Sequence, residues 1–112
     1  MINKNNIGEL KKIQDGIEFK TLVFGNNTHM IKAVLKKGTI LEHSHPQEQT
    51  GYLLKGSFQL IFDNNSNIIM PGDSWNIPGN IKHRAEILED STLVEIFSPI
   101  REDYLELEKR KL

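Results

Sequence analysis

Apolar and polar residues alternate along short stretches of the chain, as they do in strands with one buried face. In IEFKTLVF (17–24) and HMIKAVL (29–35), apolar residues recur at every second position. The connecting GNNT contains Gly and Asn, which tolerate positive φ, so the two stretches are predicted to form a hairpin. Similar stretches follow between residues typical of turns: TILEHSH, YLL, SFQLIF, NIIM, SWNI, HRAEIL and TLVEIF. Short strands at such spacing predict an all-β antiparallel sandwich or barrel.

Turn chemistry places the breaks between these strands. In this interpretation YLL and SFQLIF are separate strands joined at Lys55-Gly56, and TLVEIF begins a new strand after Glu89-Asp90. The strands occupy about residues 17–97, and the whole chain, 1–112, is expected to form a single domain.

The final segment, SPIREDYLELEKRKL, changes to a helical period. Ile100, Tyr104 and Leu107 fall on one helical face, while Ser98 is a possible cap and Pro99 suits a first helical position. Acidic residues come early and basic ones late, which complements the helix dipole. A short C-terminal helix is therefore predicted at about 99–110.

Some of the predicted strands carry apolar residues on both faces. Tyr52 and Leu54 lie opposite Leu53, and Val94 and Ile96 lie opposite Leu93. An isolated sandwich usually leaves one face of each sheet polar, so a homodimer is predicted to bury the second face. Docking of the C-terminal helix on that face is the alternative.

Composition narrows the classes of function. The chain has no cysteine, which excludes disulfides, thiolate metal sites and thiol nucleophiles, and its net charge of −1 disfavours a nucleic-acid surface. The N-terminal MINKNNIGELKK lacks the apolar run of a signal peptide, and no segment is long enough to span a bilayer. A cytoplasmic location and no membrane association are expected.

The stretch LEHSHPQEQTGYLLKG contains the most specific chemistry. Residues two or four apart on a strand share a face, so His43, His45 and Gln49 converge while Glu48 points to the opposite side. A further histidine, His83, follows the turn PGN and begins a strand. Imidazole and amide ligands of this kind predict one divalent transition metal, with zinc, nickel, iron, manganese and copper left open. Because all four ligands are neutral, the ion would retain its full charge as a Lewis acid.

These motifs resemble those of the cupin superfamily of small jelly-roll barrels. The first cupin motif runs glycine, HxH, Glu or Gln, glycine, and the second runs glycine, proline, histidine. The matching residues are Gly38, His43, His45, Gln49 and Gly56 in the first, and Gly72, Pro78 and His83 in the second. The gap from Gly38 to His43 is one residue shorter than usual, and Ile87 stands where Asn is frequent; neither departure removes a ligand.

The tail VEIFSPIREDYLE resembles the pectin-degradation cupins of the KdgF type, which open and ketonise 4,5-unsaturated uronate monosaccharides. The resemblance implies that Glu95, Phe97 and Arg101 are catalytic residues and that the small-molecule partner is a carboxylated sugar. Glu95 replaces the aspartate that is usual in that family.

The residues themselves are consistent with these roles. Glu95 shares a predicted face with Leu93 and Phe97, and desolvation there would raise its pKa from a reference of about 4.3 toward values useful in proton transfer. Arg101 offers a planar fork suited to a carboxylate. The alternatives are a solvent-facing Glu95, a surface ion pair for Arg101 and a purely core role for Phe97. Trp75 is expected in the core and His29 in a structural role.

Three classes of function fit these observations. The favoured class is a metal-dependent isomerase-type enzyme acting on unsaturated uronates. The others are a metal-dependent dioxygenase and a non-catalytic sugar- or metal-binding cupin. The absence of a DNA-binding helix pair in the sequence disfavours a transcriptional regulator.

Overall fold

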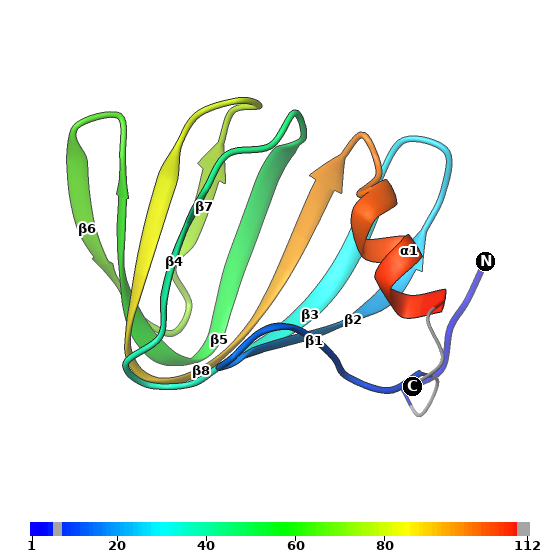
Figure 1. Ribbon diagram of the computed structural model, residues 1–112, viewed down its shortest axis with the longest axis horizontal. Coiled ribbons are helices and arrows are strands. Elements are labelled where there is room, and N and C mark those ends of the chain that lie inside the picture. The colour runs from blue at the N-terminus through cyan, green and yellow to red at the C-terminus, as the bar shows by residue number, and fades with distance from the viewer. Residues whose placement is uncertain (6–7, 110–112) are drawn as a thin grey trace.

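The computed structural model describes residues 1–5 and 8–109 and consists of antiparallel β-sheet with a short C-terminal helix (Figure 1). This confirms the predicted fold class, an antiparallel jelly-roll architecture with a short helix at the end. The elements in chain order are β1 (Lys11–Gln14), β2 (Ile17–Phe24), β3 (His29–Leu35), β4 (Ile40–His43), β5 (Glu48–Phe62), β6 (Asn65–Ile69), β7 (Ser74–Ile77), β8 (His83–Ser98) and α1 (Glu102–Lys109).

Two long strands, β5 and β8, organise the molecule. They pair along nearly their whole length, while the first part of β8 also pairs with β4 and its last part with β3. The path through the sheet is β1-β2-β3-β8-β5-β6, with β4 added to β8 and β7 added to β5. The sheet therefore bends over itself into a sandwich-like trough that is not closed, with α1 beside β2 and β3 (Figure 1).

The expected breaks inside β5 and β8 are corrected by the structure. Lys55-Gly56 lies within one continuous strand, at a series of register shifts between β5 and β8. Gly56 has φ +97°, and a Cβ there would lie 2.4 Å from the carbonyl oxygen of Asp90, so glycine permits the bend without ending the strand. Glu89 and Asp90 also stay within a strand, where their carboxylates accept hydrogen bonds from Ser57 Oγ and the Lys37 main chain, each at 2.9 Å.

Both ends of the chain differ in detail from the prediction. The sheet begins at β1, before residue 17; the sequence of β1, KKIQ, holds a single apolar residue and so lacks alternation. The helix begins at Glu102, so Ser98 is not its cap and Pro99 is not its first residue. The predicted end of the helix at residue 110 lies outside the described residues. Within the described part of the chain, no helix is long and apolar enough to cross a membrane.

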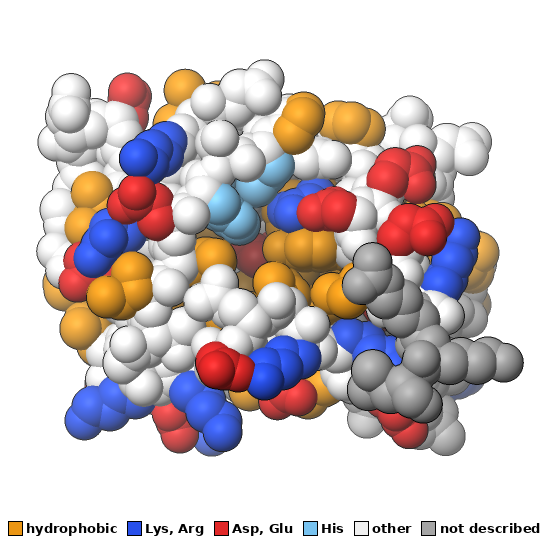
Figure 2. Space-filling model, in the orientation of Figure 1, with side chains coloured by type: hydrophobic (Ala, Val, Ile, Leu, Met, Phe, Trp, Pro, Cys, Tyr) orange, Lys and Arg blue, Asp and Glu red, His pale blue; other side chains and the backbone are white. Residues whose placement is uncertain are grey.

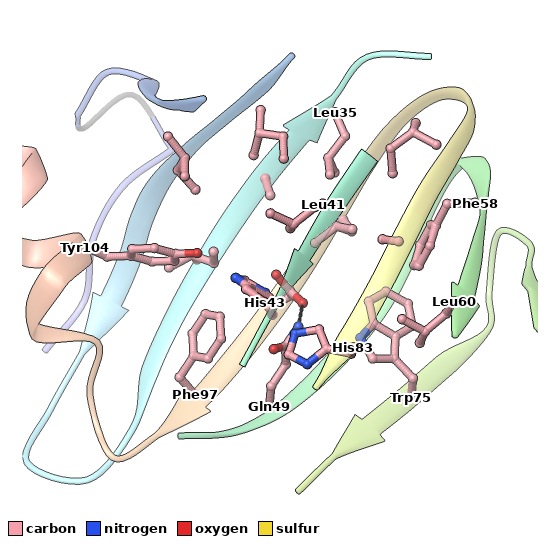
Figure 3. A pocket seen from close by; sticks show the side chains of 18 residues that line it. Leu35, Leu41, His43, Gln49, Phe58, Leu60, Trp75, His83, Phe97 and Tyr104 are labelled. Atoms are coloured by element: carbon pink, nitrogen blue, oxygen red, sulfur yellow. Dashed lines mark hydrogen bonds between the residues drawn. The ribbon is translucent and has the colours of Figure 1, made fainter. Parts of the chain in front are cut away.

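The space between the two layers of the trough holds the apolar core. Its buried members come from both layers and from α1: Ile17, Phe19, Ile31, Ala33, Leu35, Leu53, Phe58, Leu60, Ile69, Trp75, Ile77, Ala85, Ile87, Leu93, Phe97 and Tyr104. A pocket opens into this space, with Leu35 at one end and Gln49, His83 and Phe97 together at the other (Figure 3). The polar end of the pocket is the candidate site.

Candidate metal centre and active site

Three histidines meet at the polar end of the pocket. His43 ends β4 and faces His83, the first residue of β8, directly across the sheet. His45 lies two residues beyond His43 in the loop before β5. One nitrogen from each ring lies within 4.8 Å of the others, and the ring centroids are 4.5–5.1 Å apart. Figure 3 shows His43 and His83 turned into the same space.

Gln49 joins this cluster from β5. The single strand predicted for His43, His45 and Gln49 is wrong, because β4 ends at His43 and β5 begins at Glu48, with His45 in the loop between them. Its Oε1 lies 2.9 Å from Nε2 of His45, and its side chain is buried. Glu48, the neighbouring residue, is exposed on the other face and accepts a hydrogen bond from Asn76 at 3.0 Å. The four predicted metal ligands are therefore brought together, and Glu48 is kept out of the cluster.

Hydrogen bonds to the main chain set the tautomer of two histidines. His45 Nδ1 lies 3.0 Å from the carbonyl oxygen of Gln47, and His83 Nδ1 lies 2.9 Å from that of Ile81. A carbonyl oxygen can only accept, so each Nδ1 carries the proton and each neutral ring presents a bare Nε2 to the cluster.

The atoms left facing the cluster are acceptors that lack donors. His83 Nε2 is buried with no hydrogen-bond partner among the described residues, and the bare Nε2 of His45 faces the amide oxygen of Gln49. Two acceptors at hydrogen-bond distance repel each other unless a cation or a proton lies with them. The lone pairs of these nitrogen and oxygen atoms therefore fit a metal ion.

Burial also keeps the histidines neutral. Desolvation is the main cause that lowers the pKa of all three, and for His43, whose neighbours His83 and His45 add to the effect, the pKa falls to about 4. Neutral imidazole is the form that binds metals, so the cluster is ready to accept an ion near neutral pH.

Glu95 lies on the inward face of β8 and lines the same pocket. Its carboxylate accepts a hydrogen bond from Nε2 of Gln49, the dashed contact in Figure 3. Burial raises the pKa of Glu95 to about 7, against the lowering effects of the Gln49 hydrogen bond, the Arg101 charge and a hydrogen bond from Trp75. The solvent-facing alternative for Glu95 is thereby excluded, and a carboxyl that exchanges protons near neutral pH stands beside the metal ligands.

Arg101 lies just before α1 and is buried, with only 5% of its surface exposed. Asp103 accepts hydrogen bonds from its Nε (3.0 Å) and Nη2 (2.8 Å). The guanidinium lies over the ring of Tyr104, 3.8 Å from its centroid, and 4.9 Å from that of Phe97. Nη1 has no partner among the described residues, although it is buried. Arg101 is thus no surface ion pair; it is a fixed cation with one free edge.

Phe97 lies between the histidine cluster and Arg101. It is 1% exposed and lines the pocket between Gln49 on β5 and His29 on β3, its cross-strand neighbours. Its ring meets that of His45 edge-on at 5.6 Å and also contacts the Arg101 guanidinium. Figure 2 shows the outcome at the surface: a hollow with histidine side chains at its rim and paired basic and acidic side chains beside them.

The structure adds residues that the sequence did not single out for the site. Asp103 and Tyr104 hold the Arg101 side chain, and Trp75 reaches Glu95 as well as filling the core. Trp75 needs Gly51 beneath it, because a Cβ at Gly51 would lie 2.2 Å from the indole ring. The position of Asp103, two residues after Arg101, could have indicated the ion pair from the sequence. No sequence pattern indicated that Trp75 lies near Glu95.

Comparisons with known proteins agree with this geometry. A family model described as a cupin domain matches residues 31–98. The pectin degradation protein KdgF of Dickeya dadantii (strain 3937) is 31% identical over 98 residues, which cover 85% of this chain and 89% of that protein.

Solved structures give the same result. KdgF from a Halomonas species superimposes with a TM-score of 0.85 at 25% identity, over 92% of this chain and 96% of its own. An RmlC-like cupin from Shewanella frigidimarina NCIMB 400 superimposes with a TM-score of 0.86 at 27% identity, over 92% and 94% of the two chains. With a matching domain model, a buried histidine cluster and relatives of nearly the same length, this chain belongs to the cupin family and is similar to the pectin degradation protein KdgF.

Proposed function

We propose that this protein is a metal-dependent enzyme that opens and ketonises 4,5-unsaturated uronates. One observation carries the proposal: a carboxyl with a pKa of about 7, on Glu95, and a fixed guanidinium with a free Nη1, on Arg101, flank the same histidine cluster. A proton-transfer group and a carboxylate-binding group at a metal site fit a sugar acid as substrate. Similarity to KdgF, a pectin degradation protein, supports the substrate class.

The metal would be held by His43, His45, Gln49 and His83. Zinc, nickel, iron, manganese and copper all accept such ligands. With four neutral ligands, the ion would supply an undiminished positive charge that holds and polarises substrate oxygens.

Arg101 would bind the substrate carboxylate. Asp103 occupies Nε and Nη2, which fixes the fork, and Nη1 remains available for an oxygen of the substrate. The guanidinium lies over the Tyr104 ring and near the Phe97 ring, and these apolar neighbours reduce its hydration and would strengthen its pairing with an anion. Phe97 would also form the wall against which the sugar ring rests.

Glu95 would carry the proton. In the proposed reaction the anomeric hydroxyl loses its proton, the bond between C1 and the ring oxygen breaks, and C1 becomes a carbonyl. The electron pair released to the ring oxygen forms the C5 ketone as C4 gains a proton. The net change moves one proton from the anomeric oxygen to C4, with no oxidant or reductant. A carboxyl that titrates near neutral pH can both accept and donate that proton.

The test is turnover of a 4,5-unsaturated uronate, followed as loss of the ultraviolet absorbance of the C4=C5 double bond. The protein is first loaded separately with each candidate metal, and metal-stripped protein serves as the control. Metal-dependent loss of absorbance, with a keto product seen by NMR, is the expected result. Oxygen consumption instead would point to the dioxygenase alternative, and sugar binding without turnover would point to the non-catalytic one.

We also propose that two copies of the chain associate through the outer face of β5 and β8. Tyr52 and Leu54 on this face are 49% and 51% exposed, and Ile96 is 36% exposed. Helix α1 does not cover them, because its buried Tyr104 packs inward on Phe19 and Phe97. A second copy would bury these side chains in a self-complementary contact. Light scattering at micromolar concentration should give a dimer mass for the wild type and a monomer mass for Leu54→Glu; a monomeric wild type would refute the proposal.

A further inference from the structure

His29 is a buried histidine outside the metal cluster, and both of its ring nitrogens have specific partners. It begins β3, is 0% exposed and lies beside Phe97 on the inner face of the sheet. Nδ1 lies 3.2 Å from the main-chain nitrogen of Arg101, and Nε2 lies 2.7 Å from Oγ1 of Thr21. These bonds connect β2, β3 and the segment that leads into α1.

The partners dictate where each proton lies. A main-chain N–H can only donate, so Nδ1 of His29 is the acceptor for Arg101. The proton of the neutral ring is then on Nε2 and is donated to Thr21 Oγ1, whose own hydroxyl proton goes to the carboxylate of Glu108 on α1. The Glu108 carboxylate also accepts the Thr21 main-chain N–H at 2.9 Å. The chain of bonds thus runs in one direction, from Arg101 to Glu108.

Hydrogen bonds hold both main-chain polar groups of Arg101, its carbonyl oxygen and its N–H. The Arg101 carbonyl oxygen accepts the N–H groups of Tyr104 and Leu105, each at 3.1 Å, in the first turn of α1. Its N–H is held by His29. With both groups fixed, the Cα of Arg101 has little freedom, and its side chain starts from a defined place to reach Phe97 and Tyr104.

We propose that His29 is a positioning residue for the carboxylate-binding arginine: through Nδ1 it holds the peptide N–H of Arg101 and so places the guanidinium against Phe97 and Tyr104, which line the pocket. The inference rests on the proposed function, since it assigns Arg101 the substrate carboxylate. It differs from a purely structural role in one respect. The bond to Arg101 should affect substrate binding, whereas the bond to Thr21 should affect stability alone.

Two substitutions separate these bonds. The side-chain oxygen of asparagine occupies roughly the place of Nδ1, so His29→Asn retains an acceptor for Arg101 and loses the donor to Thr21. The amide nitrogen of glutamine occupies roughly the place of Nε2, so His29→Gln retains the donor to Thr21 and loses the acceptor. Each variant deletes one hydrogen bond of the same buried ring, which makes them controls for each other.

The first measurement is hydrogen exchange of the Arg101 amide, read by NMR, which needs no substrate. Exchange should be at least tenfold faster in His29→Gln than in the wild type and within about threefold in His29→Asn. The second is steady-state kinetics with an unsaturated uronate. KM should rise about tenfold in His29→Gln with kcat changed by less than threefold, and KM in His29→Asn should stay within about twofold of the wild type.

The two measurements keep the inference separate from the proposed function. A wild type with no uronate turnover defeats the proposed function and, with it, the carboxylate role on which the inference rests, while exchange still shows whether the bond exists. Equal exchange in the two variants, or equal KM values in the presence of turnover, would overturn the positioning role and leave His29 as a structural residue.

Discussion

The histidine cluster and the Arg101 region lie on either side of Phe97, yet they are held in place differently. In the cluster, His45 and His83 are oriented by carbonyl oxygens only two residues away, at Gln47 and Ile81. In the Arg101 region, Asp103 holds the guanidinium locally, but the bonds that fix the Arg101 main chain and helix α1 join residues 72 and 87 positions apart. The hydrogen bond from Gln49 of the cluster to Glu95 spans 46 positions.

This difference has a consequence for how each region responds to change. Local hydrogen bonds come with the conformation of one short segment, so the orientation of the His45 and His83 rings depends little on distant parts of the fold, although the pairing of β4 with β8 brings His43 and His83 together. The position of Arg101 depends on β2, β3 and α1 meeting correctly. Substitutions in the Arg101 region should therefore alter substrate binding and leave metal binding intact, while substitutions in the cluster should abolish both.

The largest expected effect is the loss of metal in His45→Ala. Loss of a group that only orients a metal ligand typically lowers metal affinity by about 10–100-fold, and loss of an imidazole ligand itself costs more, so stoichiometric metal, measured by elemental analysis after dialysis, should disappear. His29→Asn is the matched control, because it alters a buried histidine outside the cluster and should keep its metal. A His45→Ala protein with full metal content would contradict the ligand assignment.

The next effect concerns Glu95, which is hydrogen-bonded to Gln49 of the cluster. Glu95→Gln should lower kcat by roughly 10²–10⁴-fold, because it removes the group that moves the proton. Metal content should equal that of the wild type, which separates this loss from damage to the cluster. Unchanged kcat in a metal-loaded variant would assign the proton transfer to another group.

A smaller effect is expected at Arg101. Arg101→Ala should raise KM by about 30–100-fold, which corresponds to one charge-assisted pairing, with a lesser fall in kcat from lost orientation. Arg101→Lys should recover only part of the loss, because an ammonium group lacks the planar fork. Metal content is measured in both variants, and its loss would show that the two regions are not independent.

The smallest effect is on stability and its pH dependence in the metal-free protein. The pKa of Glu95 is raised by burial to about 7 in the folded state, so between its ordinary value of 4.5 and about 7 the unfolded chain binds fewer protons than the folded one. Stability from this group therefore falls as pH rises through that window, by at most about 3 kcal/mol.

Glu95→Gln isolates this contribution. The lowered histidine pKa values act in the opposite direction, adding stability as pH rises toward 6.5, but both proteins share them. The difference in unfolding free energy, variant minus wild type, should increase from pH 4.5 to 7 and then level off. Urea titrations across this range provide the measurement, and a constant difference would show that Glu95 titrates normally.

Much of the architecture could be predicted from alternation and turn residues. The hairpin of β2 and β3 has the bounds that its apolar pattern indicates, because one face of each strand is buried. The pattern did not reveal that β5 and β8 are continuous strands. Glycine and acidic residues are typical of turns, but here Gly56 allows a bulge and Asp90 accepts a hydrogen bond from the main chain of Lys37, in the loop between β3 and β4. Those partners lie far away in the sequence.

The sequence by itself determined the strand faces, which place Gln49 and Glu48 on opposite sides of β5. A period of two is a property of the extended backbone and needs no tertiary contact. The meeting of Gln49 with the histidines came instead from the pairing of β4 with β8 and from the loop before β5. Only the tertiary structure decided the state of Glu95, the free edge of Arg101 and the partners of His29. Protonation and hydrogen bonding depend on which atoms surround a group in three dimensions, and here those atoms come from β2, β3, β5, β8 and α1. Long-range packing of this kind leaves no periodic trace in the chain.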